Sequence, residues 1–172
     1  MRVFAAQVLG GQKHAPRQRV IADEVLGNLD ADGFLGATPE QIIESLNATI
    51  REAAERMGRA THDLPFYTLA EAEAAITLVQ GLEPPGVGAR DLRECLLLQI
   101  KARGDEGTLA ARLVREFFDE LVAHRWSDLA KRLGISPQEV QAASDAVAKL
   151  NPKPTGAEAN GKADYITPDF VV

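Results

Sequence analysis

The sequence predicts an all-α protein of two packed helical subdomains, followed by an irregular tail. Apolar residues recur every three or four positions along most of the chain, which is the spacing of an amphipathic helix. Several of these stretches begin with a helix-capping sequence. Segments rich in glycine and proline separate them, and such segments interrupt helices. With 45% hydrophobic and 26% charged residues among 172, the composition is that of an ordinary folded domain.

The N-terminal part is expected to hold four or five helices. A short helical fragment is predicted at residues 3–9, and a longer helix at residues 16–29. The next helix begins at TPEQ, residues 38–41, where a threonine hydroxyl accepts from a free backbone N–H and proline occupies the first turn. Its predicted apolar face consists of Ile42, Ile43, Leu46, Ile50, Ala53 and Met57.

Two further helices follow the weaker capping sequences TLAE, residues 68–71, and DLRE, residues 91–94. The helix that follows DLRE is apolar nearly all round, which predicts a central helix buried on several sides. It contains Cys95, the single cysteine, so an internal disulfide is impossible and the thiol is expected to be a small core residue. The helix that follows TLAE carries the apolar stripe Leu69, Ala72, Ile76, Val79 and Leu82.

The later part of the chain predicts a three-helix unit with a helix-turn-helix outline. One helix carries the stripe Leu109, Leu113, Phe117 and Leu121. Residues 126–150 then show a short helix, a turn at which Ala130 and Gly134 are expected to let the helices approach closely, and a helix capped by SPQE. A DNA-reading helix offers Arg, Lys, Asn or Gln from its first turns. Residues 107–150 carry six basic and six acidic side chains, so the prediction favours protein contact over DNA contact.

These elements predict a division into three parts. Residues 1–104 form an N-terminal helical subdomain, and residues 105–151 form the three-helix unit. Residues 152–172 form an irregular tail, because prolines and other helix breakers interrupt them and YITPDFVV is predicted to be extended. The chain stops within an apolar run, so we expect a domain of a longer protein.

Composition and motifs exclude several classes of function. The net charge of −6 argues against a chain that holds nucleic acid mainly through phosphate contacts. There is neither a secretion signal nor an apolar run long enough to span a membrane, and the lone thiol fits a reducing compartment, so a cytoplasmic protein is expected. The three histidines, His14, His62 and His124, do not have the spacing of a ligand or catalytic set, and the sequence contains no nucleophile motif. Catalysis, a cofactor and a small-molecule substrate are therefore not expected.

The stretch NLDADGFL, residues 28–35, begins like a calcium-binding EF-hand loop. The twelfth position of such a loop needs a bidentate glutamate, but Pro39 stands there. A helix end is the better interpretation. Gly33 then supplies a left-handed turn, and Phe34 and Leu35 enter the core.

The most informative stretch is LEPPGVGARDLRECLLLQI, residues 82–100. Its prolines stop the preceding helix, its glycines allow a sharp reversal, and Asp91 and Glu94 place negative charge at the positive end of the next helix. The lone GxG lacks the third glycine and the lysine of nucleotide-binding loops. Two interpretations stay open: a rigid helix–helix corner with Arg90 in a local salt bridge, or a contact surface. The candidate residues are Pro84, Pro85, Gly86, Val87, Gly88, Ala89, Arg90 and Asp91.

This stretch closely resembles a signature of the core-binding domain of bacterial sigma-54 factors. NLDADGFL and the pair LNPKP and YITPDFVV resemble two other motifs of that family, in the same order, so the resemblance covers most of residues 29–172. Two departures are visible. Phe34 replaces a tyrosine, and Thr155 replaces a glycine, which predicts a looser turn there.

The resemblance implies docking of a sigma-54 factor on core RNA polymerase, without catalysis. The family's glutamine-rich activator-binding region and its promoter-reading C-terminal domain have no counterpart in this chain, so promoter DNA is expected to bind only weakly or through that C-terminal domain. The candidate corner is expected to contact polymerase or to shape the subdomain. The alternatives are a stand-alone helix-turn-helix DNA-binding module and a helical adaptor that reaches polymerase through a second protein.

Overall fold

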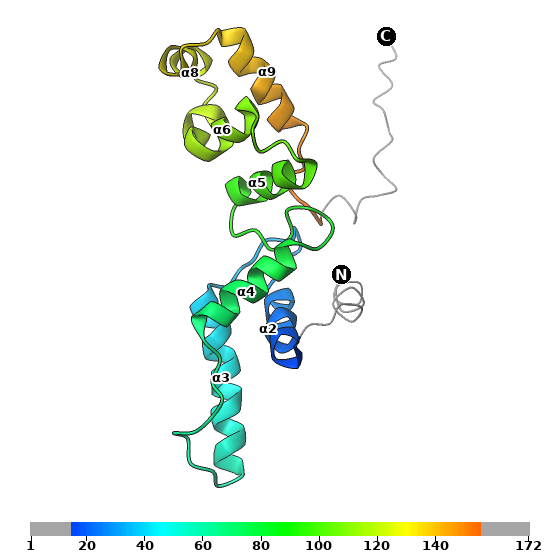
Figure 1. Ribbon diagram of the computed structural model, residues 1–172, viewed down its shortest axis with the longest axis vertical. Helices are drawn as coiled ribbons and strands as arrows, with labels where there is room; N and C mark the ends of the chain where they lie inside the picture. Colours follow the sequence, from blue (N-terminus) through cyan, green and yellow to red (C-terminus); the bar gives the residue numbers. More distant parts are fainter. Residues whose placement is uncertain (1–14, 156–172) are drawn as a thin grey trace.

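The computed structural model describes residues 15–155, and in this range every regular element is a helix. Figure 1 shows an elongated arrangement with α2–α4 at one end, α6–α9 at the other, and α5 between them. The all-α prediction is therefore confirmed, while the predicted fragment at residues 3–9 and the tail beyond residue 155 lie outside the described residues. The helices are α2 (Pro16–Gly27), α3 (Pro39–Arg56), α4 (Leu69–Gln80), α5 (Leu92–Arg103), α6 (Leu109–Glu116), α7 (Phe118–Val122), α8 (Trp126–Leu133) and α9 (Pro137–Ala148).

Two hydrophobic clusters hold these helices together. The first lies among α2, α3 and α4 and includes the fully buried Ile21, Ile42 and Ile76. The second joins α6–α9 and takes in Leu96 and Ile100 of α5. We refer to the two groups of helices as the first and second bundle. The division at residue 104 stays a prediction, and the apolar face of α5 packs with the second bundle.

Capping explains where most helices begin. Thr38, Thr68 and Ser136 each form a capping box, in which the hydroxyl accepts the N–H of the third helical residue and that residue's side chain accepts the N–H of the cap. Asp91 and Thr108 cap α5 and α6 through their side chains alone. Each such cap stabilises its helix by about 1 kcal/mol. The sequence predicted four of these five starts, and the cap at Thr108 is added by the structure.

Three expectations about the apolar stripes are wrong. Leu69 is 43% exposed, because it is the first residue of α4. The stripe from Leu109 to Leu121 is divided between α6 and α7, because the backbone leaves helical geometry at Phe117 with φ −133°. The break lets the adjacent rings of Phe117 and Phe118 both pack against the second cluster, whereas neighbours in one straight helix point about 100° apart. Met57 is 73% exposed, because it lies at the end of α3 beyond the helices that cover the rest of its face.

The loop between α3 and α4 is tied to α2 by Arg17. Its guanidinium donates to the carbonyl oxygens of Pro65 at 2.9 Å and Phe66 at 2.5 Å, and lies 4.2 Å from the centre of the Tyr67 ring. It also forms an ion pair with Glu71 of α4. One side chain thus fixes the loop and α4 against α2.

The Arg17–Glu71 pair predicts a pH dependence of stability. The hydrogen bond from Arg17, with further ones from Thr68, lowers the pKa of the Glu71 carboxyl from 4.5 to about 2. A carboxyl whose folded pKa is lowered stabilises the fold above its unfolded pKa, and this contribution is lost as pH falls from 4.5 through about 2. We expect the urea midpoint to drop less between pH 7 and pH 3 in Glu71→Gln than in the parent chain. Equal drops would mean that the pair contributes nothing measurable.

Candidate functional site

The candidate residues form a tight corner between α4 and α5, which we call the PPGVGARD corner (residues 84–91). Gly86 and Gly88 have φ of +100° and +75°, which favour glycine. The inner side of the corner is buried from Gly86 to Ala89. Its backbone is bonded to the loop after α2, since the Gly88 N–H donates to the Gly33 carbonyl at 2.9 Å and the Leu35 N–H donates to the Ala89 carbonyl at 2.9 Å. The predicted sharp reversal is present.

The outer side of the corner is exposed at Pro85, Arg90 and Asp91. The Arg90 guanidinium donates to Glu73 of α4 at 2.7 Å, with both side chains about half exposed. Exposed ion pairs of this kind contribute between about 0 and 1 kcal/mol. The local salt bridge that the sequence left open is thus present, but it holds little of the fold, and the guanidinium stays accessible to a partner.

A small polar network fixes the corner to both neighbouring helices. The Gln80 side-chain amide donates to the Gly88 carbonyl and to one oxygen of Glu94, each at 3.1 Å. The other oxygen of the Glu94 carboxylate accepts the backbone N–H of Arg90 at 2.7 Å. Beside this network, a cavity of about 420 Å³ opens between the end of α4 and α5, with Pro85 in its wall. The outer side therefore offers an accessible cation at Arg90 and, separately, a hollow whose own cation is Lys101.

A third segment, residues 151–155, returns to this corner after α9, which the sequence analysis did not predict. The Gln99 side chain, buried in α5, donates to the Asn151 carbonyl at 2.5 Å and accepts the Asn151 N–H at 2.8 Å. Lys153 pairs with Asp32 at 3.1 Å. The only sequence signal was Gln99, a polar residue at a buried position on the apolar face of α5.

Thr155 completes this return. Its hydroxyl donates to the Ala31 carbonyl at 2.7 Å, a bond that glycine cannot make. Its methyl group lies against Gly33, where an added Cβ would come within 2.7 Å of it. The threonine side chain thus adds a contact between the residues after α9 and the loop after α2, and the looser turn stays a prediction.

The NLDADGFL loop uses its carboxylates to close on itself. Asp30 accepts the N–H groups of Asp32 and Phe34, each at 2.9 Å, and Asp32 is paired with Lys153. Gly33 has φ +90°, and Leu35 is buried while Phe34 is partly buried. Within residues 15–155, no group of three acidic, histidine or cysteine side chains is arranged to hold a metal ion. The structure thus gives these acids a structural role in the turn.

The helix-turn-helix outline is present as α8, a turn at Gly134 with φ +68°, and α9. No atom lies within 4 Å of a Cβ built at Gly134, so this glycine serves the turn and not the close helix approach that the sequence suggested. The exposed first turn of α9 presents Gln138, Glu139 and Gln141. Because this part of α9 presents no cation, contact with protein in preference to DNA stays the prediction for the helix-turn-helix unit.

No helix within residues 15–155 is long and apolar enough to cross a lipid bilayer. The buried thiol of Cys95 has a raised pKa because burial disfavours the thiolate, as expected for a core cysteine.

Fold and corner together define a two-bundle helical binding domain, whose bundles meet at a junction of three chain segments. The model of the family "Sigma-54 factor, core binding domain" matches residues 5–172. The chain belongs to this family.

Named relatives agree with this family. The chain is 33% identical over 156 residues to the RNA polymerase sigma-54 factor of Bacillus subtilis (strain 168), covering 90% of this chain and 31% of the relative. It is 32% identical over 157 residues to that of Pseudomonas putida, covering 90% and 29%, and 31% identical over 159 residues to that of Sinorhizobium fredii, covering 92% and 27%. The chain thus spans less than a third of the length of these relatives.

Proposed function

We propose that this chain docks a sigma-54 factor on core RNA polymerase. The observation that carries the proposal is the family match over residues 5–172, which includes the PPGVGARD corner and both segments bonded to it. The domain acts in the cytoplasm as a binding module and catalyses no reaction. Promoter DNA is read by a part of the factor outside this chain, since the helix-turn-helix of the second bundle offers no cation in its exposed first turn.

We further propose that the outer side of the corner takes part in this docking. The buried inner side joins the two bundles, Arg90 is accessible on the outer side, and Pro85 lines the hollow between α4 and α5. A cation at such a site is suited to an acidic residue of the partner. Because the corner joins both bundles, contacts made here would also depend on how the bundles are arranged.

The test is direct binding of the purified chain to core RNA polymerase, with a sigma-54-type promoter duplex as the parallel ligand. Polymerase binding with negligible binding of the duplex is the expected result. Binding of the duplex alone, weakening steeply with salt, would instead assign the chain to stand-alone DNA-binding modules. Binding of polymerase only when a second protein is present would assign it to adaptors.

Arg90→Ala is expected to weaken polymerase binding about tenfold, a loss of roughly 1.4 kcal/mol of binding free energy. Helicity should be unchanged, because the ion pair with Glu73 is half exposed. Arg112→Ala is the matched control, since Arg112 forms a similarly exposed pair with Glu116 at 3.1 Å, on α6. Binding by titration and far-UV circular dichroism measure both effects. If the Arg90 variant is unfolded, or binds polymerase as the parent chain does, Arg90 only shapes the corner.

A further inference from the structure

Arg90 is held to the fold far less firmly than Arg17, although both arginines pair with a glutamate of α4. Arg17 contacts both carboxylate oxygens of Glu71, through Nε and Nη2, and it also donates to two backbone carbonyls. Arg90 makes a single side-chain hydrogen bond within residues 15–155, from Nη2 to Oε2 of Glu73 at 2.7 Å. Strong arginine–carboxylate pairs are bidentate. The Arg90–Glu73 pair is therefore the weaker of the two, and the Arg90 guanidinium keeps N–H groups for another acceptor.

The Arg90–Glu73 pair can open without disturbing the corner. The two side chains are 45% and 50% exposed, so both charges stay hydrated when the pair separates. The backbone need not move, because the Arg90 N–H is bonded to the Glu94 carboxylate at 2.7 Å and the preceding Ala89 is buried. Only the Arg90 side chain has to rotate to meet a partner.

Arg90 lies among acidic side chains, of which Glu73 alone holds the guanidinium within residues 15–155. Glu94 accepts the backbone N–H of Arg90 instead. The pKa of the exposed Glu40 carboxyl, at the start of α3, is lowered first by hydrogen bonds to its own backbone N–H and to Thr38, and the charge of Arg90 lowers it further. A carboxylate that arrives from a partner must therefore displace Glu73 to pair with Arg90.

We propose that Glu73 competes with an acidic residue of core RNA polymerase for the Arg90 guanidinium. Docking then exchanges the single contact with Glu73 for a bidentate contact with the carboxylate of the partner. Glu73 thereby lowers the affinity of the corner, because the apparent affinity falls with the fraction of molecules in which the binding group is free. The inference rests on the proposed docking function, and it adds to that function a residue of this chain that opposes docking.

The test removes the competing carboxylate. Glu73→Gln keeps the shape of the side chain without its charge, and glutamine is a good helix former, so α4 is retained. Exposed pairs change an equilibrium by up to about fivefold, so we expect polymerase binding to strengthen about two- to fivefold in a titration. Glu116→Gln is the matched control, because it breaks the similarly exposed Arg112–Glu116 pair with the same change of charge. Its affinity for polymerase should equal that of the parent chain.

The Arg90→Ala background shows whether the gain passes through Arg90. In Arg90→Ala/Glu73→Gln the gain should vanish, because no guanidinium is left to release. An equal gain in both backgrounds would mean that polymerase merely prefers a less acidic chain, and the inference would be overturned. It is also overturned if Glu73→Gln binds no better than the parent chain while Arg90→Ala binds more weakly, since Glu73 would then only orient Arg90.

The remaining outcomes separate this inference from the proposed function. If the parent chain does not bind polymerase, the docking proposal fails and this inference fails with it. If the parent chain binds and Arg90→Ala binds equally well, the contact at the corner and this inference both fail, while docking itself stands. The circular dichroism spectrum of each variant should match that of the parent chain, so that every change in affinity is read on a folded protein.

Discussion

Gly86→Ala is expected to lower the free energy of unfolding by about 3–5 kcal/mol, because two costs combine at this position. The backbone has φ +100°, which an L-residue rarely adopts. An added Cβ would also lie 2.8 Å from the Cys95 sulfur and 3.1 Å from the Gln99 amide nitrogen, both in the buried part of α5. Neither side chain can move aside without losing packing or its bond to the Asn151 segment. Chemical unfolding followed by circular dichroism measures the loss.

Gly104→Ala is the matched control for this substitution. Gly104 has φ +76°, but no atom lies within 4 Å of a Cβ built there. It therefore reports the backbone strain alone, about 1–2 kcal/mol. The excess loss at Gly86 measures how closely α5 packs against the corner. If both variants lose the same stability, the corner is not held against α5 as the structure places it.

Much of this corner could be predicted from the sequence because it is local. Proline stops a helix, glycine permits positive φ, and aspartate caps the next helix within a stretch of eight residues, so Pro84 to Asp91 determine their own backbone. The same holds for Asp30, whose carboxylate closes the loop two and four residues further on. Side-chain chemistry of this range needs no knowledge of the rest of the fold.

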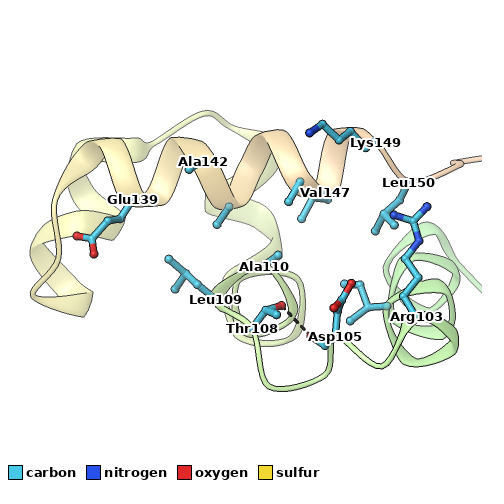
Figure 2. A pocket seen from close by; sticks show the side chains of 13 residues that line it. Arg103, Asp105, Thr108, Leu109, Ala110, Glu139, Ala142, Val147, Lys149 and Leu150 are labelled. Atoms are coloured by element: carbon cyan, nitrogen blue, oxygen red, sulfur yellow. Dashed lines mark hydrogen bonds between the residues drawn. The ribbon is translucent and has the colours of Figure 1, made fainter.

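The ties across the junction could not be predicted, because they join residues far apart in the chain. Gln99 meets Asn151 across 52 residues, and Thr155 meets Ala31 across 124. Nothing near Thr155 indicates which carbonyl its hydroxyl will find. A groove of about 470 Å³ between α6 and α9 (Figure 2) could not be predicted for a related reason. Ala142 and Ala146 fit an ordinary helix, and only the placement of α6 shows that nothing covers them.

The break at Phe117 shows a different limit. The residues from 109 to 121 keep a good helical period, so the period alone predicts one helix. Tertiary packing decides otherwise, since both phenylalanine rings pack against the second cluster and the helix is broken at Phe117. The change is local, and it leaves the all-α prediction unaffected.

Gln99→Met is expected to cost about 2–4 kcal/mol of stability. Methionine has nearly the volume of glutamine, so packing in α5 is kept while both hydrogen bonds to Asn151 are lost. The backbone N–H and carbonyl of Asn151 are then left without these partners in a part-buried place, and an unsatisfied buried group costs about 1–3 kcal/mol. Urea unfolding measures the loss. Gln141→Met is the control, because Gln141 is exposed on α9 and should change stability by less than about 0.5 kcal/mol.

Hydrogen exchange at single amides distinguishes whether Gln99 holds the two bundles together or only stabilises the core around it. Residues 151–155 hold the loop after α2 through Lys153 and Thr155, so releasing Asn151 should also free that loop, which lies in the other bundle. We expect faster hydrogen exchange in Gln99→Met at the Gly88 and Leu35 amides, which donate across the junction. The Val140 amide, inside the second bundle, should exchange at the parent rate relative to global unfolding. Uniform acceleration at all three amides would mean that Gln99 stabilises the whole fold as an ordinary core residue and has no particular role at the junction.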